Sequence, residues 1–358
     1  MEKLVQNIYK ALKTKYQIEI IGPTGCKEFV DTNTSVIVCP ASPIFVFLLC
    51  SFIMSLYRAL RFRPAIVFGG SGLVAPAVVC VSKIVGVRST CYLHGLDIVA
   101  DNVLYRMVFL PAIRALDTVI VNSRNTAKLA EEVGIHASKL NILHPSVSFE
   151  SSYPLQPGRK DNLLSDSDTH CKILLSVGRL TDRKGLAEFV EHAMPALVSK
   201  FSDLKLIIIG DSATDAVKST SNQIEKITSI AKSLDLQEHV KLLGIVDDAT
   251  LNTAYEMSDV LVFPVLPKKD DVEGFGIVAI EAAAHGLPTV AFNVGGVSDA
   301  VSNNISGYLV ESGNYSVLVN SIAMILDKQA DITAKSCREF AMGFSRSEFE
   351  RNLLSICG

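Results

Sequence analysis

The sequence is poor in the residue patterns that bind metals or form disulfides. None of its eight cysteines belongs to a Cys-x-x-Cys pair, and most of them lie in apolar runs. Such cysteines are typical of reduced core residues in a cytoplasmic protein. The seven histidines form no cluster with metal-ligand spacing, and no segment has the charged start and cleavage site of a signal peptide. We therefore expect a cytoplasmic protein that has no metal-ligand cluster.

A dinucleotide-binding fingerprint is also missing. No Gly-x-Gly-x-x-Gly follows a first strand with an acidic residue about 20 positions later, which disfavours a nicotinamide-dependent oxidoreductase. The 358 residues are too many for one ordinary core and suit two domains. With 49% hydrophobic and 20% charged residues, the composition is that of a well-packed globular protein rather than a disordered one.

The formal net charge of -3 conceals a difference between the two halves of the chain. Residues 1–150 contain 15 Lys and Arg against 10 Asp and Glu, a balance of +5. The remainder contains 19 basic and 27 acidic residues, a balance of -8. This asymmetry suggests different partners for the two halves, although ordinary surface variation explains it equally well.

One apolar segment bears on the expectation of a soluble protein. It runs from Pro43 to Tyr57 and leads into Arg58, Arg61 and Arg63. The segment is shorter than the roughly 20 residues of a membrane-spanning helix. We expect a buried helix between two strands. The alternative is a helix that lies on a membrane surface, with the arginines facing anionic headgroups.

The first half of the chain alternates strand-like and helix-like segments. Strands are expected at 17–23, 35–40, 65–72 (where the strand enters a glycine-rich loop), 89–95 and 117–123, and helices at 75–85 and 126–133, the latter capped by Ser123. Continuous β-branched runs between helices indicate a parallel sheet that is covered on both faces. Residues 151–170 are rich in Ser, Asp and Pro and have no hydrophobic period, which indicates a linker between domains.

The second half repeats this alternation. Strands are expected at 173–178, 204–211, 240–244, 260–263 and 288–292, with helices between them. The glycine turns of both halves follow the expected strands, at their carboxyl ends. Two α/β halves joined by a linker form a cleft, and ligands in such folds bind at the carboxyl ends of the strands.

The stretch Glu273–Glu281, with the sequence EGFGIVAIE, places a glycine turn at the start of a helix. Such a turn presents free backbone N–H groups and the positive end of the helix dipole, which together bind anions. Glu273 and Glu281 flank this site. Two carboxylates beside an anion site are unfavourable unless the ligand also has hydroxyl groups that donate hydrogen bonds to them. A phosphorylated sugar supplies both the anion and the hydroxyls.

A second loop, Val177–Gly185, carries Arg179 and Lys184 after the first strand of the second half. An arginine offers a planar fork to phosphate oxygens and a lysine adds a point charge. Together with the glycine turn at residues 273–277, this loop predicts a diphosphate clamp. Taken alone, it is equally consistent with a solvated basic loop.

These motifs resemble those of the retaining glycosyltransferases of family 4, which are GT-B enzymes. The matching segments follow one another in the order and spacing of that family: SVGRLTDRKG, IIIGD, KLLGIV, SDVLVFP, EGFGIVAIEAAAHGLPTVAFNVGGVSDAV and GYLV. In the first half, LHGLDIV, DTVIVNS and the following helix are similar to the bacterial mannosyltransferases that act on lipid acceptors.

The resemblance implies an α/β protein of the GT-B fold, with two Rossmann-like domains whose parallel sheets face each other across a cleft. Residues 1–155 would form the N-terminal acceptor-side domain, and residues 165–339 the C-terminal domain that binds the nucleotide-sugar donor. A C-terminal helix within 340–358 would cross back to complete the N-terminal domain.

The resemblance also implies roles for individual residues. Arg179 and Lys184 would neutralise the donor diphosphate and the charge that grows on the leaving group. Glu273 would bind the donor sugar hydroxyls, Glu281 would bind the ribose hydroxyls, and His94 would face the donor sugar. The distal phosphate and the sugar would be held by backbone N–H groups of Gly274, Phe275, Gly276 and Ile277. The nucleotide pocket would be lined by Gly178, Gly210, Asp211, Gly244, Ile245 and Val246.

The implied reaction is metal-independent transfer of a sugar with retention at the anomeric carbon. The leaving phosphate would accept the proton of the incoming hydroxyl, while Glu273 acting as a covalent nucleophile remains an alternative. The donor would be GDP-mannose or a UDP-hexose. The acceptor would be a lipid-linked or cell-envelope glycan such as lipopolysaccharide, reached by peripheral contact with the inner membrane face. No nucleic acid is expected as a partner.

Two other functions stay open at this point. One is a GT-B sugar-nucleotide epimerase, and the other is a non-catalytic protein that binds sugar nucleotides. Family members open with a strand and a double-glycine loop, whereas Met1–Tyr9 resembles the part that follows that loop. We therefore expect the strand and its phosphate-facing glycines to be absent, and low activity or poor stability as a result.

Overall fold

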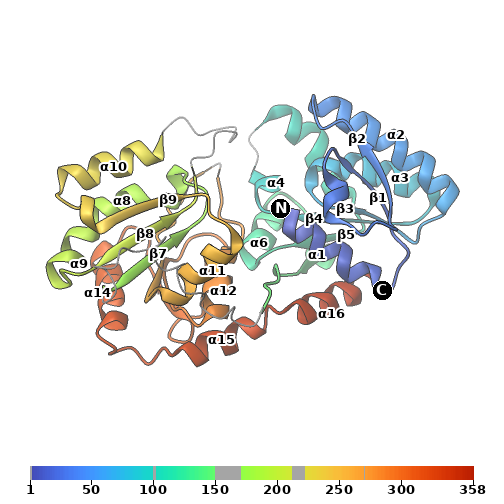
Figure 1. The fold of residues 1–358 in the computed structure, drawn as a ribbon. Helices are drawn as coiled ribbons and strands as arrows, with labels where there is room; N and C mark the ends of the chain where they lie inside the picture. The colour runs from blue at the N-terminus through green and yellow to red at the C-terminus, as the bar shows by residue number, and fades with distance from the viewer. Residues whose placement is uncertain (1, 100–101, 150–170, 212–221, 270) are drawn as a thin grey trace. The chain divides into compact units, whose positions relative to one another are not determined.

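The computed structural model describes residues 2–99, 102–149, 171–211, 222–269 and 271–358. They divide into two compact units, which we describe separately. The first unit contains residues 1–146 and 346–358, and the second contains residues 147–345. Both are built from parallel strands and covering helices, so the predicted α/β class is confirmed (Figure 1).

The first unit contains four parallel strands in the order β3 (Ile66–Gly69), β4 (Arg88–Leu93), β5 (Thr118–Val121) and β6 (Leu140–Ile142). A separate parallel pair is formed by β1 (Glu19–Pro23) and β2 (Ser35–Cys39). Adjacent residues of β4 point to opposite faces of the sheet, as strand geometry requires. Cys91 and Leu93 join one buried cluster and Tyr92 joins the other.

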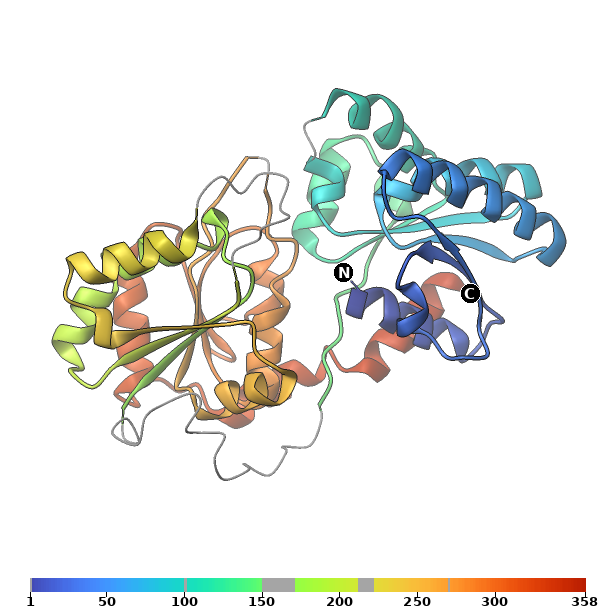
Figure 2. The ribbon, with the colours of Figure 1, turned by 45° about the horizontal axis from the view of Figure 1, so that its top comes forward.

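Helices cover both faces of this sheet (Figure 2). The cluster with Cys91 and Leu93 packs α3 (Ala75–Val85), α5 (Leu110–Ala115) and α6 (Arg124–Glu132) against one face. The cluster with Tyr92 packs α1 (Glu2–Lys13) and α16 (Arg346–Cys357) against the other face. Short elements connect them: η1 (Cys26–Phe29), η2 (Gly72–Val74), α4 (Leu96–Val99), the π-helix η3 (Tyr105–Phe109) and η4 (Ala137–Lys139).

The predicted Ser123 cap is confirmed. Its side chain accepts a hydrogen bond of 3.0 Å from the backbone N–H of Thr126 at the start of α6. Such a cap satisfies one of the backbone donors that a helix leaves unpaired at its N-terminus.

The apolar segment of the first half forms α2 (Ile44–Phe62), but the expectation that this helix is buried is wrong. Of its 19 residues, only Ser51 and Ala59 are buried. The reason is that α2 packs on the two-stranded pair and on α3, which cover only part of its circumference. Among the described helices, α2 alone has the length and apolar composition that could cross a membrane, judged by those two properties only.

The second unit contains six parallel strands in the order β12 (Gly307–Val310), β11 (Thr289–Phe292), β10 (Val260–Phe263), β7 (Ile173–Val177), β8 (Lys205–Ile209) and β9 (Val240–Gly244). The strand β7 comes first in sequence and lies inside the sheet. The chain adds β8 on one side of it and β10 on the other, so the strand order reverses between β7 and β10.

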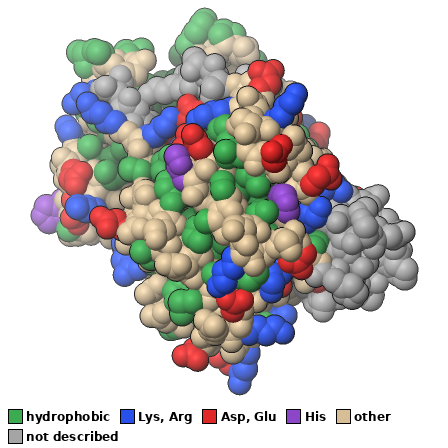
Figure 3. All heavy atoms as spheres, turned by 90° about the vertical axis from the view of Figure 1, so that its left-hand side faces the viewer, with side chains coloured by type: hydrophobic (Ala, Val, Ile, Leu, Met, Phe, Trp, Pro, Cys, Tyr) green, Lys and Arg blue, Asp and Glu red, His purple; other side chains and the backbone are tan. Residues whose placement is uncertain are grey.

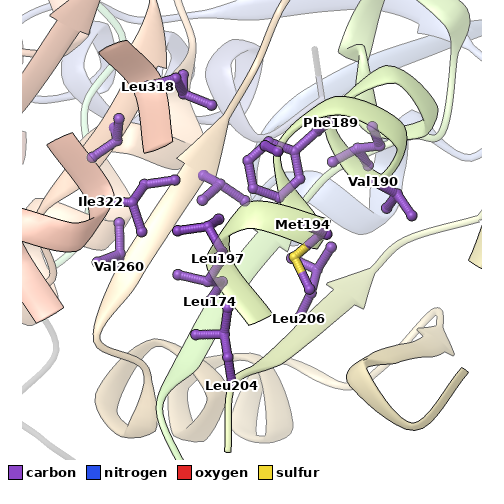
Figure 4. Close-up of a cluster of buried hydrophobic side chains, with 14 of the residues drawn as sticks. Leu174, Phe189, Val190, Met194, Leu197, Leu204, Leu206, Val260, Leu318 and Ile322 are labelled. Carbon is purple, nitrogen blue, oxygen red and sulfur yellow. The ribbon is translucent and has the colours of Figure 1, made fainter. Parts of the chain in front are cut away.

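Two large hydrophobic clusters lie on the two faces of this sheet. Leu174 and the even-numbered residues of β8 pack against α8 (Leu186–His192), α9 (Met194–Lys200), α10 (Gln223–Ser233) and α14 (Tyr315–Leu326), as Figure 4 shows in part. Leu175 of β7 and Ile207 and Ile209 of β8 pack against α11 (Asp248–Met257), α12 (Ile277–His285), α13 (Val297–Ala300) and α15 (Ala334–Met342). The described part of this unit also contains the short helices η6 (Asp182–Lys184) and η7 (Gln237–His239).

The boundaries of the units differ in one place from those expected. The predicted linker at 151–170, with the boundaries at 155 and 165, lies outside the described residues. The predicted return to the first unit at residue 340 is too early, because α15 packs against α12 and belongs to the second unit. Only α16 joins the first unit.

Candidate functional site

Two loops meet beside the point where the strand order of the second unit reverses. Residues 178–185 follow β7, and residues 264–276 follow the neighbouring strand β10. The backbone N–H of Leu266 donates to the carbonyl of Arg183 at 2.8 Å. A Cβ atom at Gly185 would lie 2.1 Å from the carbonyl oxygen of Pro264, so only glycine allows this approach. A reversal of this kind is where open α/β sheets bind ligands.

Glu273 lies at the centre of a buried cluster of charges between these loops. Its Oε2 atom accepts hydrogen bonds from Lys184 Nζ, at 2.8 Å, and from Arg183 Nη1. The Nε atom of Arg183 donates to Asp271 Oδ1 at 2.9 Å. The side chains of Arg183, Glu273 and Lys184 are only 10%, 13% and 15% exposed, so water screens these charges weakly.

The pKa values of the cluster follow from burial and from the neighbouring charges. Burial would raise the pKa of the Glu273 carboxyl, but the charges of Lys184 and Arg183 outweigh it and hold this pKa below its usual value. Burial lowers the pKa of Lys184, Glu273 opposes that shift, and Arg183 and Arg179 add to it. The ammonium of Lys184 also lies 4.6 Å from the centre of the Phe263 ring, a favourable cation–π distance. Glu273 is therefore ionised at neutral pH.

Arg179 supplies a positive charge beyond those that the buried cluster balances. Arg183 and Lys184 face the two carboxylates of Asp271 and Glu273, so these four charges sum to zero. Arg179 is exposed at the start of the same loop, near enough to affect the pKa of Lys184. The structure thus brings together the two cations of the predicted clamp. An anion such as a diphosphate would meet a net positive charge here.

Arg183 is a component of the site that the sequence analysis missed. It is adjacent to Lys184, and the tight turn of η6 directs both side chains to Glu273. The available signal was the pair of neighbouring basic residues in RLTDRKG. That pattern does not say which of Arg179, Arg183 and Lys184 are buried, because their burial depends on the loop after β10.

The helix α12 begins at the predicted glycine turn. Gly276 is its N-cap and has a φ of 91°, in the left-handed region that favours glycine. The side chain of Phe275 is buried against Phe344, with ring centroids 5.7 Å apart, so only the backbone of Phe275 is available to a ligand. The positive end of the α12 dipole therefore lies at residues 274–277, next to the cluster around Glu273.

A third loop, after β11, supports the backbone of Glu273 and Gly274. The N–H of Gly296 donates to the carbonyl of Glu273 at 2.8 Å. A Cβ atom at Gly296 would lie 2.1 Å from the carbonyl oxygen of Gly274, and one at Gly295 would lie 2.6 Å from that of Glu273. No local pattern in the sequence predicts a role for this glycine pair. The structure shows that it allows two backbone segments to touch.

Glu281, the second predicted acid, is held by a buried tyrosine. Tyr255 on α11 donates from its hydroxyl to Glu281 Oε2 at 3.0 Å. Burial, together with the charge of Glu281, raises the pKa of Tyr255 well above its ordinary value, so the phenol stays protonated and remains a donor. Glu281 follows Ile277 by four residues, which places both on one face of α12. Tyr255 was not predicted, because no local motif links it to α12.

The predicted nucleotide-pocket residues gather at the adjacent part of the same sheet edge. Gly178, Gly210 and Gly244 end the neighbouring strands β7, β8 and β9, with φ values of 135°, 136° and 67°. A Cβ atom at Gly210 would lie 2.0 Å from the carbonyl oxygen of Gly178. The carbonyl of Asp211 accepts from Leu180 N at 2.9 Å, which ties the two loops together. Ile245 is 82% exposed beyond Gly244, and Val246 is half-buried.

His94 belongs to the first unit, whereas the other predicted site residues belong to the second. It follows β4, its backbone N–H donates to Asp97 Oδ2 at 2.8 Å, and its Nε2 donates to the carbonyl of Gly70 at 2.9 Å. These contacts fix the imidazole against the glycine loop after β3. Its proposed place opposite the donor sugar stays a prediction.

Among the described residues, no group of three or more His, Cys, Asp or Glu side chains is arranged to hold a metal ion. The site is instead formed by cations, two carboxylates and a helix N-terminus. Metal-independence stays a prediction.

The fold and the site together define a class. Each unit is an α/β unit with a parallel sheet and glycine loops at the strand ends, and the second carries a cationic site at its topological switch. This is the architecture of a GT-B glycosyltransferase. The model of the family described as Glycosyltransferase Family 4 matches residues 1–151, and that of Glycosyl transferases group 1 matches residues 165–342. The chain belongs to the family 4 glycosyltransferases of the GT-B fold.

Solved structures support the fold across nearly the whole chain. A glycosyltransferase from Rickettsia africae has a TM-score of 0.81 at 20% identity and covers 99% of this chain and 93% of its own. Anabaena HepE, solved in complex with UDP-glucose, has a TM-score of 0.76 at 17% identity, with 99% and 94% covered. At these identities the similarity establishes the fold alone.

One curated relative is the GDP-mannose-dependent alpha-(1-6)-phosphatidylinositol monomannoside mannosyltransferase of Mycobacterium tuberculosis. It is 27% identical over 64% of this chain and 55% of its own length. The first relatives matched are covered over 61%, 33% and 50% of their lengths, so the chain spans about half the length of the curated relatives that it matches.

Proposed function

We propose that the chain is a hexosyltransferase that moves a sugar from a nucleotide-diphosphate sugar to a hydroxyl acceptor, with retention at the anomeric carbon. The observation that carries this proposal is the cluster of Arg183, Lys184 and Glu273 beside the N-terminus of α12. Together with Arg179, it combines a positive field for a diphosphate with a fixed carboxylate that can accept hydrogen bonds from sugar hydroxyls.

In this proposal the donor diphosphate lies between Arg179, Lys184 and the backbone N–H groups of residues 274–277. The positive charges stabilise the charge that develops on the leaving group, which is the largest electrostatic demand of the reaction. Because they are already fixed by the fold, no divalent cation is required for this task. Glu281, held by Tyr255, binds the ribose hydroxyls of the nucleotide.

The ion pairs of Glu273 favour one of the two routes to retention. A carboxylate whose pKa is lowered by two cations is a weak nucleophile, because its electron density is shared with Lys184 and Arg183. We therefore propose that Glu273 orients the sugar hydroxyls and does not form a covalent intermediate. The leaving phosphate oxygen accepts the proton of the attacking hydroxyl on the same face of the sugar.

The names of similar proteins indicate which donors and acceptors to test. HepE was solved with UDP-glucose, and the mycobacterial relative is named for GDP-mannose and a phosphatidylinositol mannoside. We propose GDP-mannose or a UDP-hexose as the donor, and a lipid-linked or cell-envelope glycan, such as a lipopolysaccharide precursor, as the acceptor. The protein would act in the cytoplasm, at the inner membrane face.

The test measures donor binding and turnover separately. Thermal unfolding with UDP, GDP, UDP-glucose and GDP-mannose should identify one donor that raises the melting temperature, and Glu281→Ala should weaken that effect. Nucleotide-diphosphate release should then increase when a polyprenyl-linked glycan is added, and the new linkage should have the anomeric configuration of the donor. A sugar isomerised without acceptor would indicate an epimerase. Binding without any turnover would indicate a non-catalytic protein, and either result would contradict the proposal.

A further inference from the structure

The outer surface of the helix layer in the first unit exposes large apolar side chains over three neighbouring helical segments. α3 packs beside α2 on one side and beside η3 and α5 on the other. Figures 1 and 2 both show this row of helices along one side of the unit. α3 and α5 cover the sheet with their inner sides, α2 packs on β1, β2 and α3, and large apolar side chains of these neighbouring segments are exposed.

The exposed side chains of α2 form a continuous stripe. Phe45, Leu49, Ile53 and Tyr57 follow one another at intervals of four residues, which places them along one face of the helix. They and Leu60 are between 49% and 67% exposed. A stripe of large apolar residues in water is unfavourable, and clustered exposed apolar side chains mark interaction sites.

The segment that includes η3 extends this surface. Val103, Leu104 and Met107 are 74%, 66% and 72% exposed, and Ile84 of α3 is also exposed. Since α3 contacts both α2 and η3, the exposed residues belong to neighbouring segments of one helix layer.

The charge of this layer has a single sign. From Thr32 to Leu96 the sequence contains no Asp or Glu, although it contains Arg58, Arg61, Arg63, Lys83 and Arg88. Residues 102–116 also lack acids and contain Arg106 and Arg114. Arg58 is used inside the unit, where its Nε donates to Glu19 Oε2 at 2.8 Å, whereas Arg61, Arg63 and Lys83 are exposed. By contrast, the face of the molecule in Figure 3 mixes acidic and basic side chains.

We propose that this helix layer docks on an anionic lipid bilayer, with the apolar side chains of α2 and residues 103–108 in the headgroup region and Arg61, Arg63 and Lys83 facing lipid phosphates. A second copy of the chain is a poorer occupant, because a two-fold contact of this surface would bring like charges together. A spanning position of α2 does not fit either, because α2 packs on β1, β2 and α3. An apolar face flanked by basic residues matches a helix that lies in the interface.

This surface deepens the proposed function, since it would hold the protein where a lipid-linked acceptor is found. Its test uses neither donor nor acceptor, so it fails or succeeds independently of the transferase assay. The purified full chain is sedimented with vesicles of phosphatidylcholine alone and of phosphatidylcholine mixed with phosphatidylglycerol. Binding should be at least about tenfold stronger to the anionic vesicles.

Two double substitutions separate the apolar and the charged contributions. Phe45→Ser with Leu49→Ser should weaken binding to anionic vesicles by about tenfold or more, because two inserted side chains are lost. Arg61→Gln with Arg63→Gln should reduce the preference for anionic over neutral vesicles by a similar factor. All four side chains are exposed or outside the core, so the melting temperature should not change.

Matched controls come from the second unit. Val317→Ser with Met324→Ser removes two exposed apolar side chains of α14, and Lys328→Gln with Lys335→Gln removes two exposed charges. Both controls should bind vesicles as the wild type does. Wild-type binding that does not distinguish the two vesicle types would overturn the proposal. It would also be overturned if the controls weakened binding as much as the α2 variants, or if a concentration-dependent dimer were lost in the Phe45 and Leu49 variant.

Discussion

At the scale of single residues, the site depends on how Glu273 is kept ionised. Its carboxylate is almost fully buried, and burial alone would favour the protonated form. Two adjacent cations reverse this preference because their interaction with a buried charge is weakly screened. The ion pairs of Glu273 therefore stabilise the folded protein fully above pH 4.5, which is the usual pKa of this carboxyl. As the pH falls from there through the lower pKa of the folded state, this contribution to the free energy of unfolding is lost.

Arg183→Gln should raise the pKa of Glu273, because it removes one of these two cations. In the pH profile of kcat/KM, the acidic limb should move to higher pH. At neutral pH, kcat/KM should fall by about tenfold, because the Glu273 carboxylate loses one of the two charged hydrogen bonds that position it. Arg179→Gln is the matched control, since Arg179 is exposed and shows no direct bond to Glu273. It should raise KM without moving the acidic limb. Identical acidic limbs in the wild type and the Arg183 variant would contradict the role of Arg183.

Tyr255→Phe should weaken nucleotide binding by about 1 kcal/mol, because Glu281 loses the hydrogen bond that fixes its carboxylate. Titration calorimetry with the preferred nucleoside diphosphate measures the change. Tyr315→Phe, which alters a tyrosine that packs against Phe292, should leave the affinity unchanged. An equal loss in both variants would mean that the effect is general loosening of the unit.

At the scale of elements, the position of Glu273 depends on three loops that follow neighbouring strands. The loop after β7 supplies the cations, the loop after β10 supplies the carboxylate, and the loop after β11 supports the backbone of that carboxylate. Parallel strands bring these loops to one edge although they lie far apart in the sequence. Besides the ion pairs of Glu273, the loops also touch backbone to backbone, as at Leu266 with Arg183 and at Gly296 with Glu273, which explains why glycines are placed there.

Gly296→Ala should separate the loops after β10 and β11, because the new Cβ atom would lie 2.1 Å from the carbonyl oxygen of Gly274. We expect donor affinity to fall by about tenfold or more and the melting temperature to decrease by several degrees. Gly343→Ala is the control. Its φ of -61° suits alanine, and the nearest atom to its new Cβ is 3.4 Å away. A Gly296→Ala protein with wild-type affinity would show that this contact does not position the site.

At the scale of the whole molecule, the last helix of the chain completes the first unit. Phe349, Leu353 and Cys357 of α16 pack with Leu4 and Ile8 of α1 in the cluster that covers one face of the sheet. The second unit forms its hydrophobic clusters from residues between 147 and 344. The two units can therefore respond differently to a substitution in α16.

Leu353→Ala should destabilise the first unit by about 2–5 kcal/mol, because it leaves a cavity in the cluster shared by α1 and α16. Nucleotide binding by the second unit should persist. Differential scanning calorimetry with and without nucleotide distinguishes the two transitions, since only the one that contains the binding site shifts on addition of the ligand. Leu354→Ala is the matched control and should cost less, because Leu354 is only partly buried. Loss of nucleotide binding in the Leu353 variant would contradict separate responses.

Much of the fold is determined by the sequence alone. The β-branched runs at 173–177 and 260–263 predict buried parallel strands, because such runs are stable only when both faces are covered. Gly276 and the apolar run after it predict the start of α12, and Ser123 predicts the cap of α6. These features are local, so the identities of a few neighbouring residues are sufficient.

Tertiary structure decided the partners of those residues. Arg183 rather than Arg179 is buried against Glu273, Tyr255 holds Glu281, and Gly296 supports Gly274. α2, an apolar helix that its sequence suggested to be buried, exposes one face because β1, β2 and α3 pack on only part of it. Burial and pairing depend on which distant segments the strand order brings together, and that order is a property of the whole sheet. The residue types of the site can therefore be derived from the sequence, whereas their contacts require the fold.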